Sequence, residues 1–313
     1  MKNVPELIVG KKTREFLSRL GLPGHDLYEL PTSPLRFPDG AHFRIEIPTV
    51  NTAEAMRAVL EVTEKHGVVV NRITETYGIM RHTNKELEEM VQLAKDFQLE
   101  LVMSVGPRAA YDTSAQRATG TPEGARVGYR LRGVENLVYA IEDIRRALEF
   151  GIRAFVIYDE GLLWVLGEMK KAGEIPKDVK LKVSAHCGHA NPASFKLLES
   201  LGADSINPIR DLPLPIIASL RAAVKIPIDI HVDNPRSTGG FIRNFEAPEI
   251  VRVAAPVHIK TGNSAVETHG VPTTREQGRQ MGIQAVIAVE HIKRFFPEAV
   301  QSKRGSPDLA IPR

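Results

Sequence analysis

Apolar and polar residues alternate most regularly in residues 226–235, Ile-Pro-Ile-Asp-Ile-His-Val-Asp-Asn-Pro. Such alternation is typical of a β-strand whose side chains point in turn to opposite faces. Isoleucine and valine occupy one face, and the other carries Asp229, His231 and Asp233. Carboxylates and imidazoles are costly to bury without partners. We therefore expect neighbouring strands to supply those partners.

Strand patterns of this kind alternate with helical patterns along most of the chain. The predicted strands are residues 42–47, 68–74, 99–105, 153–158, 180–185, 205–209, 226–235 and 257–260. The predicted helices are residues 51–66, 84–97, 134–150, 162–172, 192–201, 214–224, 247–253 and 277–296. Eight strand–helix repeats over roughly 250 residues are typical of the (β/α)8, or TIM, barrel.

A doubly wound open sheet is the alternative arrangement of such repeats. It usually has a glycine-rich dinucleotide turn after its first strand. This chain has Pro-Thr-Val-Asn at residues 48–51 instead. The sequence therefore predicts a single α/β domain, a parallel TIM barrel over residues 41–300.

The two ends of the chain stand outside the repeats. Residues 1–40 are predicted to form an N-terminal arm that covers one end of the barrel or meets a partner subunit, which makes a homo-oligomer possible. Residues 301–313 contain glycine and proline and are predicted to form a loose C-terminal tail.

Two connections are longer than ordinary βα loops, residues 107–133 and 261–276. Such loops gather at the C-terminal mouth of a TIM barrel, where active sites lie. Residues 107–133 are rich in arginine. Because guanidinium suits carboxylate and phosphate groups, we expect this segment to close over the mouth, with an arginine such as Arg108 bound to an anionic substrate. A disordered insertion is the alternative interpretation.

If apolar side chains face the helices, the barrel interior is unusually polar. The predicted inward side chains are His42, Arg44, Glu46, Arg72, Thr74, Lys182, Ser184, His186, Ser205, Asn207, Asp229, His231, Asp233, His258 and Lys260. Barrel interiors are normally layers of branched aliphatic residues. Such an interior requires a charge-balanced, hydrogen-bonded network, and Arg44, Lys182 and Asp229 could serve only that structural role.

Four side chains near the strand ends suggest a metal site at the mouth. Glu46, His186, His231 and Asp233 provide two carboxylates and two imidazoles, which suit a divalent ion such as zinc, manganese or magnesium. Without a metal, the same residues could act as acid, base and orienting group. The firmest prediction is that His186, His231 and Asp233 form one site, with Asn207 on the strand between them.

Lys260 permits a different chemistry at the same mouth. A lysine among apolar walls and other cations can have a lowered pKa and form a Schiff base with a carbonyl substrate. Barrels often bind phosphate in the loops after strands seven and eight. The predicted substrate-binding residues are Arg72, Asn207, Arg108, Thr261, Asn263, Gly239 and Gly240.

Composition narrows the classes of partner. The net charge of +3 and the lack of a basic run with aromatics argue against nucleic-acid binding. The single cysteine, Cys187, excludes an internal disulfide framework and leaves no iron–sulfur cluster expected. Neither a membrane-length apolar stretch nor an apolar signal core occurs, so we expect a cytoplasmic protein.

Three segments resemble the collagenase-like bacterial peptidases of unknown catalytic type. They are residues 183–203, with Cys-Gly-His-Ala-Asn-Pro and a helix that closes on Leu-Gly, residues 208–212 and residues 228–232. The resemblance covers residues 183–233. It implies a barrel with a site near His186 and His231, and peptidase activity.

Three functions remain open on the sequence. The first is a hydrolase, with or without a bound metal ion, that acts on a small polar or amide-containing substrate. The second is a Schiff-base lyase or aldolase that uses Lys260 on a phosphorylated or carboxylated carbonyl compound. The third is a non-catalytic barrel that binds a ligand. In each case the expected partner is a small molecule, most simply an anion.

Overall fold

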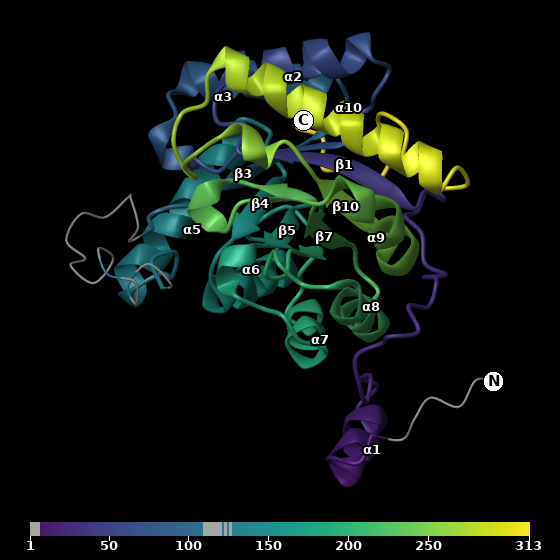
Figure 1. Ribbon diagram of the computed structural model, residues 1–313. Helices are drawn as coiled ribbons and strands as arrows, with labels where there is room; N and C mark the ends of the chain where they lie inside the picture. Colours follow the sequence, from purple (N-terminus) through teal and green to yellow (C-terminus); the bar gives the residue numbers. More distant parts are fainter. Residues whose placement is uncertain (1–6, 109–120, 122–123, 125–126) are drawn as a thin grey trace.

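The computed structural model describes residues 7–108, 121, 124 and 127–313 of the chain. Eight parallel strands close into a barrel in the order β1-β10-β7-β6-β5-β4-β3-β2 (Figure 1). These strands are β1 (Phe43–Pro48), β2 (Arg72–Thr74), β3 (Glu100–Ser104), β4 (Ala154–Ile157), β5 (Lys180–Val183), β6 (Ser205–Ile206), β7 (Ile228–His231) and β10 (Val257–Lys260). The predicted TIM barrel is confirmed.

Helices surround the barrel and cover the apolar face of each strand (Figure 1). They are α2 (Ala53–Lys65), α3 (Asn84–Asp96), α5 (Gly133–Glu149), α6 (Glu160–Ala172), α7 (Pro192–Ser200), α8 (Leu214–Ala223), α9 (Ala247–Ala254) and α10 (Arg275–Phe295). Side-chain caps fix several starts. Thr274 forms a capping box with Gln277, and Asp159 accepts from the first turn of α6.

The seventh strand is shorter than its sequence pattern predicts. It leaves the barrel after His231, and Asp233–Asn234 form β8, which pairs antiparallel with β9 (Phe241–Ile242) in a separate hairpin. The amide of Arg243 donates to the carbonyl of Val232 at 2.7 Å, so the chain between β7 and β8 is already engaged with the hairpin. The alternation of inward and outward side chains predicted for residues 226–235 therefore applies only as far as His231.

The predicted polar interior exists and is paired across strands. The strand register sets Glu46 beside Lys260 and Arg72, and His258 beside Asp229. The Glu46 carboxylate contacts Lys182, Lys260 at 2.9 Å and Arg72 at 3.3 Å. Asp229 contacts Arg72 at 3.2 Å and Lys182 at 3.4 Å. Each of these three cations thus has a carboxylate partner inside the barrel, as buried charges require.

The expectation of a loose C-terminal tail is wrong. Asp308 pairs with the buried Arg44 at 2.6 Å, the side-chain amide of Asn71 donates to the carbonyl of Ser302 at 3.0 Å, and the amide of Ala310 donates to Glu100 at 3.0 Å. Ser302 and Ala310 are buried. Because these contacts satisfy barrel residues, the tail packs against the N-terminal end of the barrel.

Loss of the tail's ion pair should destabilise the fold. The Asp308→Ala protein leaves the Arg44 guanidinium buried with only the hydroxyl of Ser302 to accept from it. We expect the free energy of unfolding to fall by about 1–3 kcal/mol, since Asp308 is partly exposed. Urea unfolding measures this, and Glu168→Ala, which removes a surface partner of Lys171 outside the tail, is the matched control. Equal stability of the two variants would contradict the role given to the tail.

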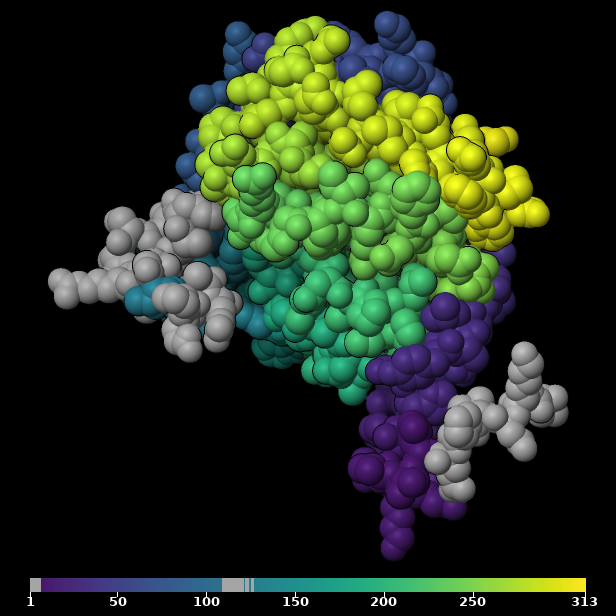
Figure 2. Space-filling view, viewed as in Figure 1, coloured from purple at the N-terminus to yellow at the C-terminus, as the bar shows by residue number. Residues whose placement is uncertain are grey.

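The N-terminal arm projects from the barrel body (Figures 1 and 2). Its helix α1 (Lys11–Arg19) has no buried residue. The following segment returns to the body, where the amide of Leu27 donates to the hydroxyl of Ser219 in α8 at 2.9 Å and Leu22 is buried. Homo-oligomer formation through the arm stays a prediction. Among the described residues, the helices are too short or too polar to cross a membrane.

Candidate functional site

A small cavity of about 20 Å³ lies inside the C-terminal mouth of the barrel. This is room for about one water molecule. Its wall combines strand ends with the loops that follow them: Pro48, Thr74, Thr76, Val156, Tyr158, Lys182, Ser184, His186, Asn207, Arg210, His231, Lys260, Asn263 and His269. The predicted residues His186, His231, Lys260, Asn207 and Asn263 therefore line one cavity.

Lys260 ends β10 and is buried at the floor of this cavity. Burial, with the nearby Lys182 ammonium, lowers the pKa of Lys260 to about 7, although Glu46 opposes this shift from 2.9 Å. An ammonium in bulk water has an ordinary pKa more than three units higher. A substantial fraction of Lys260 is thus the neutral amine near pH 7.

His231 stands beside Lys260 across the β7–β10 pair. Burial, together with the cations Lys260 and Arg210, holds the pKa of His231 well below its usual range, so the ring is neutral. Its Nδ1 atom is buried and has no hydrogen-bond partner among the residues that the structure describes. A buried unpaired nitrogen next to a neutral amine suits proton transfer to or from a bound substrate.

His186 lies under an aromatic cover. The ring of Tyr129 stacks on the His186 ring with centroids 3.7 Å apart, and its hydroxyl lies 3.1 Å from Nδ1 of His269. His269 also meets the edge of His186, at 5.0 Å between centroids. Tyr129 belongs to the long segment 107–133, and His269 to the loop after β10. The described ends of both long loops thus meet over the mouth.

Arg210 forms no ion pair with a carboxylate among the described residues. Its Nη2 atom donates to Nε2 of His186 at 3.0 Å, and its Nε atom is buried without a partner among the described residues. Burial lowers the pKa of Arg210, yet an arginine stays charged. Burial, Arg210 and other cations in turn hold the pKa values of His186 and His269 well below their usual range. The mouth therefore has a positive potential, which favours an anion.

The predicted metal-ligand set is not assembled. Asp233 accepts from the amides of Gly262 at 3.1 Å and Ser264 at 3.0 Å and from the Ser264 hydroxyl at 2.5 Å, so it braces the loop after β10. Glu46 is held by the cations of the barrel interior. Neither carboxylate joins His186 and His231 as a ligand cluster. Each carboxylate is already bound by nearby groups. Glu46 is bound by interior lysines, and Asp233 is bound by amides of the loop after β10.

A different ligand cluster lies beside the mouth, formed by Glu160, Cys187 and His189. Nε2 of His189 is 2.6 Å from Glu160, and Arg130 pairs with the same carboxylate. Burial raises the pKa of the Cys187 thiol to about 12, so it is protonated at neutral pH. An arginine on the carboxylate and a neutral thiol fit a metal ion poorly.

The other predicted substrate-binding residues have different places. Arg72 lies deep in the barrel and pairs with Glu100 at 2.5 Å. Arg108 is buried and donates to the carbonyl of Tyr77 at 2.8 Å and to the Tyr158 hydroxyl at 3.3 Å, so it supports the cavity wall from behind. The remaining arginines of 107–133 that could contact substrate include Arg117 and Arg126, which lie outside the described residues.

The residues predicted to bind phosphate do not lie in one cavity. Asn263 lines the mouth cavity, and its side chain is held by Thr49 at 2.8 Å. Thr261 is buried, and its hydroxyl has no partner within the described part of the chain. Gly239 and Gly240 lie in an exposed turn, and Gly240 lines a separate surface depression. Both glycines have positive φ, which explains their presence without a ligand.

Arg210, Tyr129, Tyr158 and His269 were not singled out as site residues by the sequence patterns. Tyr158 and Arg210 follow β4 and β6 closely, at the strand ends where barrel sites lie. That position is the signal that would have found them. Tyr129 and His269 come from long loops, whose sequences carry no periodicity that places a side chain.

Comparisons with known proteins give structural matches of low sequence identity. No family model and no curated protein matches it. Among solved structures, a U32 peptidase is 18% identical over 64% of this chain and 73% of its own, with a TM-score of 0.40. A putative fructose-1,6-biphosphate aldolase from Coccidioides immitis is 14% identical over 82% and 91%, with a TM-score of 0.49.

A third similar structure is a truncated 3-deoxy-D-arabino-heptulosonate 7-phosphate synthase from Thermotoga maritima. It is 12% identical over 87% of this chain and 95% of its own, with a TM-score of 0.47.

Proposed function

We propose that this protein is a lyase or aldolase that forms a Schiff base between Lys260 and a small anionic carbonyl compound. The observation that carries the proposal is the buried Lys260 amine, with its pKa lowered to about 7, on the floor of the mouth cavity. Neutral amines attack carbonyl carbon, whereas ammonium ions do not. The metal-assisted hydrolase is less well supported, because its ligands are not brought together.

The covalent step follows from the positions of Lys260 and His231. The Nζ lone pair attacks the carbonyl carbon, so a C–N bond forms while the carbonyl π bond breaks. The carbonyl oxygen then leaves as water with the two protons that the amine loses. His231, whose Nδ1 is unpaired and whose ring is neutral, is suited to carry a proton from nitrogen to that oxygen.

Arg210 is the group best placed to bind the anionic end of the substrate. Its unpaired Nε atom and its Nη2 atom, now on His186, can together hold a carboxylate or phosphate group. The cavity of about 20 Å³ is too small for such a substrate, so the Tyr129 ring must move away from His186 on binding. The substrate then replaces an aromatic cover that excludes water from the site.

Borohydride reduction in the presence of pyruvate tests this function. Pyruvate is a small carboxylated carbonyl compound, and reduction converts its Schiff base into a stable adduct that mass spectrometry detects. We expect one adduct per chain on the native protein and none on Lys260→Met. Lys171→Met removes an exposed lysine and should leave the adduct unchanged. If native protein and Lys260→Met are labelled to the same extent, the lyase proposal fails and the non-catalytic barrel gains support.

A further inference from the structure

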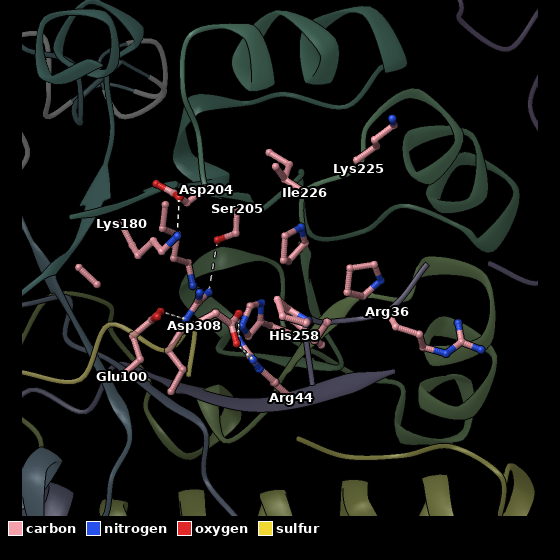
Figure 3. A pocket seen from close by; sticks show the side chains of 17 residues that line it. Arg36, Arg44, Glu100, Lys180, Asp204, Ser205, Lys225, Ile226, His258 and Asp308 are labelled. Atoms are coloured by element: carbon pink, nitrogen blue, oxygen red, sulfur yellow. Dashed lines mark hydrogen bonds and ion pairs between the residues drawn. The ribbon is translucent and has the colours of Figure 1, made fainter. Parts of the chain in front are cut away.

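A larger cavity, of about 330 Å³, opens at the N-terminal end of the barrel strands, where Lys180 begins β5 (Figure 3). In its wall, Lys180 pairs with Asp204 at 3.0 Å. Arg44 pairs with Asp308 at 2.6 Å in the same wall. Lys260 does not line this cavity. A substrate of Lys260 must therefore be recognised by groups at the mouth.

Asn207 follows β6 directly and lines the mouth cavity. Its amide nitrogen donates to the carbonyl of Asp229 at 2.7 Å and to the carbonyl of Pro208 at 3.2 Å. An amide nitrogen has two hydrogens, so these two carbonyls use both of them. They also fix the orientation of the amide, because its oxygen would repel a carbonyl in the same place. The oxygen Oδ1 therefore lies on the other side of the amide.

The Oδ1 atom of Asn207 is available to accept a hydrogen bond. It accepts none from the described residues, and, unlike Nδ1 of His231, it is not fully buried. Asn263 lines the same cavity but differs in this respect. Its oxygen accepts from Thr49 at 2.8 Å, and its nitrogen donates to Asn234 at 3.1 Å. Of these two asparagines, Asn207 is the one that can bind a ligand.

Asn207 and Lys260 lie on opposite sides of β7. The barrel order places β7 between β6 and β10, and neighbouring strands are about 4.8 Å apart. The backbones of the two residues are therefore separated by about 10 Å across the barrel wall. The lysine side chain extends into that space, and both residues line the mouth cavity. A small molecule bound to the Lys260 amine can thus reach the amide oxygen of Asn207.

The charge of the mouth indicates which kind of donor Asn207 binds. Hydroxyl, ammonium and amide N–H groups can all donate to an amide oxygen. Arg210 lines the same cavity and forms no ion pair with a carboxylate among the described residues, so it repels an ammonium ion. A hydroxyl avoids this repulsion and is smaller than an amide, which suits a narrow cavity.

We propose that the substrate of this site is a hydroxylated 2-oxo acid, with its carboxylate at Arg210, its carbonyl carbon at Lys260 and its hydroxyl donated to Oδ1 of Asn207. The proposal rests on the function proposed for Lys260 and names the class of substrate. Asn207 is a specificity-determining residue in this account, since it contacts a group that does not react with the amine.

Borohydride trapping with two matched pairs of probes tests this proposal. Hydroxypyruvate and pyruvate differ by one hydroxyl at C3, and 4-hydroxy-2-oxobutanoate and 2-oxobutanoate differ by one hydroxyl at C4. The ratio of the concentrations that give half-maximal labelling of Lys260 is measured within each pair. In at least one pair we expect the native protein to favour the hydroxylated probe by about threefold to tenfold more than Asn207→Leu does, the effect of one hydrogen bond.

The comparison of ratios removes the intrinsic reactivity of each probe, which is the same for both proteins. Asn207→Ser also lacks the amide oxygen and keeps a donor for one carbonyl, so it serves if Asn207→Leu does not fold. Asn136→Leu is the matched control, since Asn136 lies in α5 and does not line the cavity. It should keep the native ratio.

The failure of this proposal differs from the failure of the proposed function. If all four probes label Lys260 and the folded Asn207 variants keep the native ratio in both pairs, the role of Asn207 is overturned while the Schiff base stands. If no probe labels Lys260 in the native protein, the lyase proposal fails and the substrate class fails with it.

Discussion

Replacement of Glu46 by glutamine should cost about 3–5 kcal/mol of unfolding free energy, because it removes one carboxylate from three buried cations and leaves Lys260 without an ion-pair partner among the described residues. The Glu46 carboxylate is fully buried and contacts Lys182, Lys260 and Arg72. Those cations hold its pKa well below the usual value against the opposing effect of burial. Glutamine keeps the shape but supplies no charge.

Urea unfolding measures this loss, with Glu61→Gln as the matched control. Glu61 pairs with Arg275 at 2.7 Å on the surface, and its loss should change stability by about 0.5 kcal/mol or less. The pKa of Lys260 should fall further in the Glu46→Gln protein, since Glu46 raises it. A Glu46→Gln protein as stable as Glu61→Gln would mean that the interior charges are solvated and the network is not structural.

Replacement of Arg210 by glutamine should weaken the binding of pyruvate by about tenfold to a hundredfold, the effect of one charge-assisted hydrogen bond of about 1.5–3 kcal/mol. The concentration of pyruvate that gives half-maximal borohydride trapping measures this. The same change should raise the pKa values of His186 and His269, since Arg210 lowers both. Histidine proton resonances followed against pH report these values.

Arg145→Gln is the control for this prediction. Arg145 pairs with the surface carboxylates of Glu142 and Glu174 and does not line the mouth cavity. It should change neither trapping nor histidine titration. Unchanged pyruvate affinity in Arg210→Gln would remove Arg210 from the substrate site, even if the histidine pKa values rise.

The barrel could be predicted because its signals are periodic. Several strands alternate, and several helices end at a glycine, such as Gly151 and Gly202, which have positive φ. The polar interior followed from the same parity, and Glu46, Lys182 and Asp229 do face one another. Periodicity predicts the face of a strand on which a residue lies. In a closed barrel, the residues on the inner faces of different strands lie close together.

The residues that form the site could not be predicted in the same way. The alternation along a strand predicts which face a side chain lies on, but not which other side chain it contacts. Glu46 and Asp233 were expected at a metal, but lysines and loop amides nearer to them take their oxygens. The glycine and proline of the C-terminal tail suggest a loose segment, yet Asp308 forms an ion pair with Arg44. The two residues are far apart in the sequence, so their pairing could not be predicted. No sequence pattern predicts that Arg210 lies against His186 without a carboxylate partner in the described part of the chain.

The pH dependence of pyruvate trapping at Lys260 tests the central claim most directly. The neutral amine is the nucleophile, so the initial rate should rise as pH increases and level off above the pKa of Lys260. With that pKa lowered to about 7, the midpoint of the rise should lie near pH 7. Peptide mapping of the reduced adduct assigns the rate to Lys260. A midpoint near 10.5, the ordinary value for lysine, or an adduct carried by other lysines, would contradict the account.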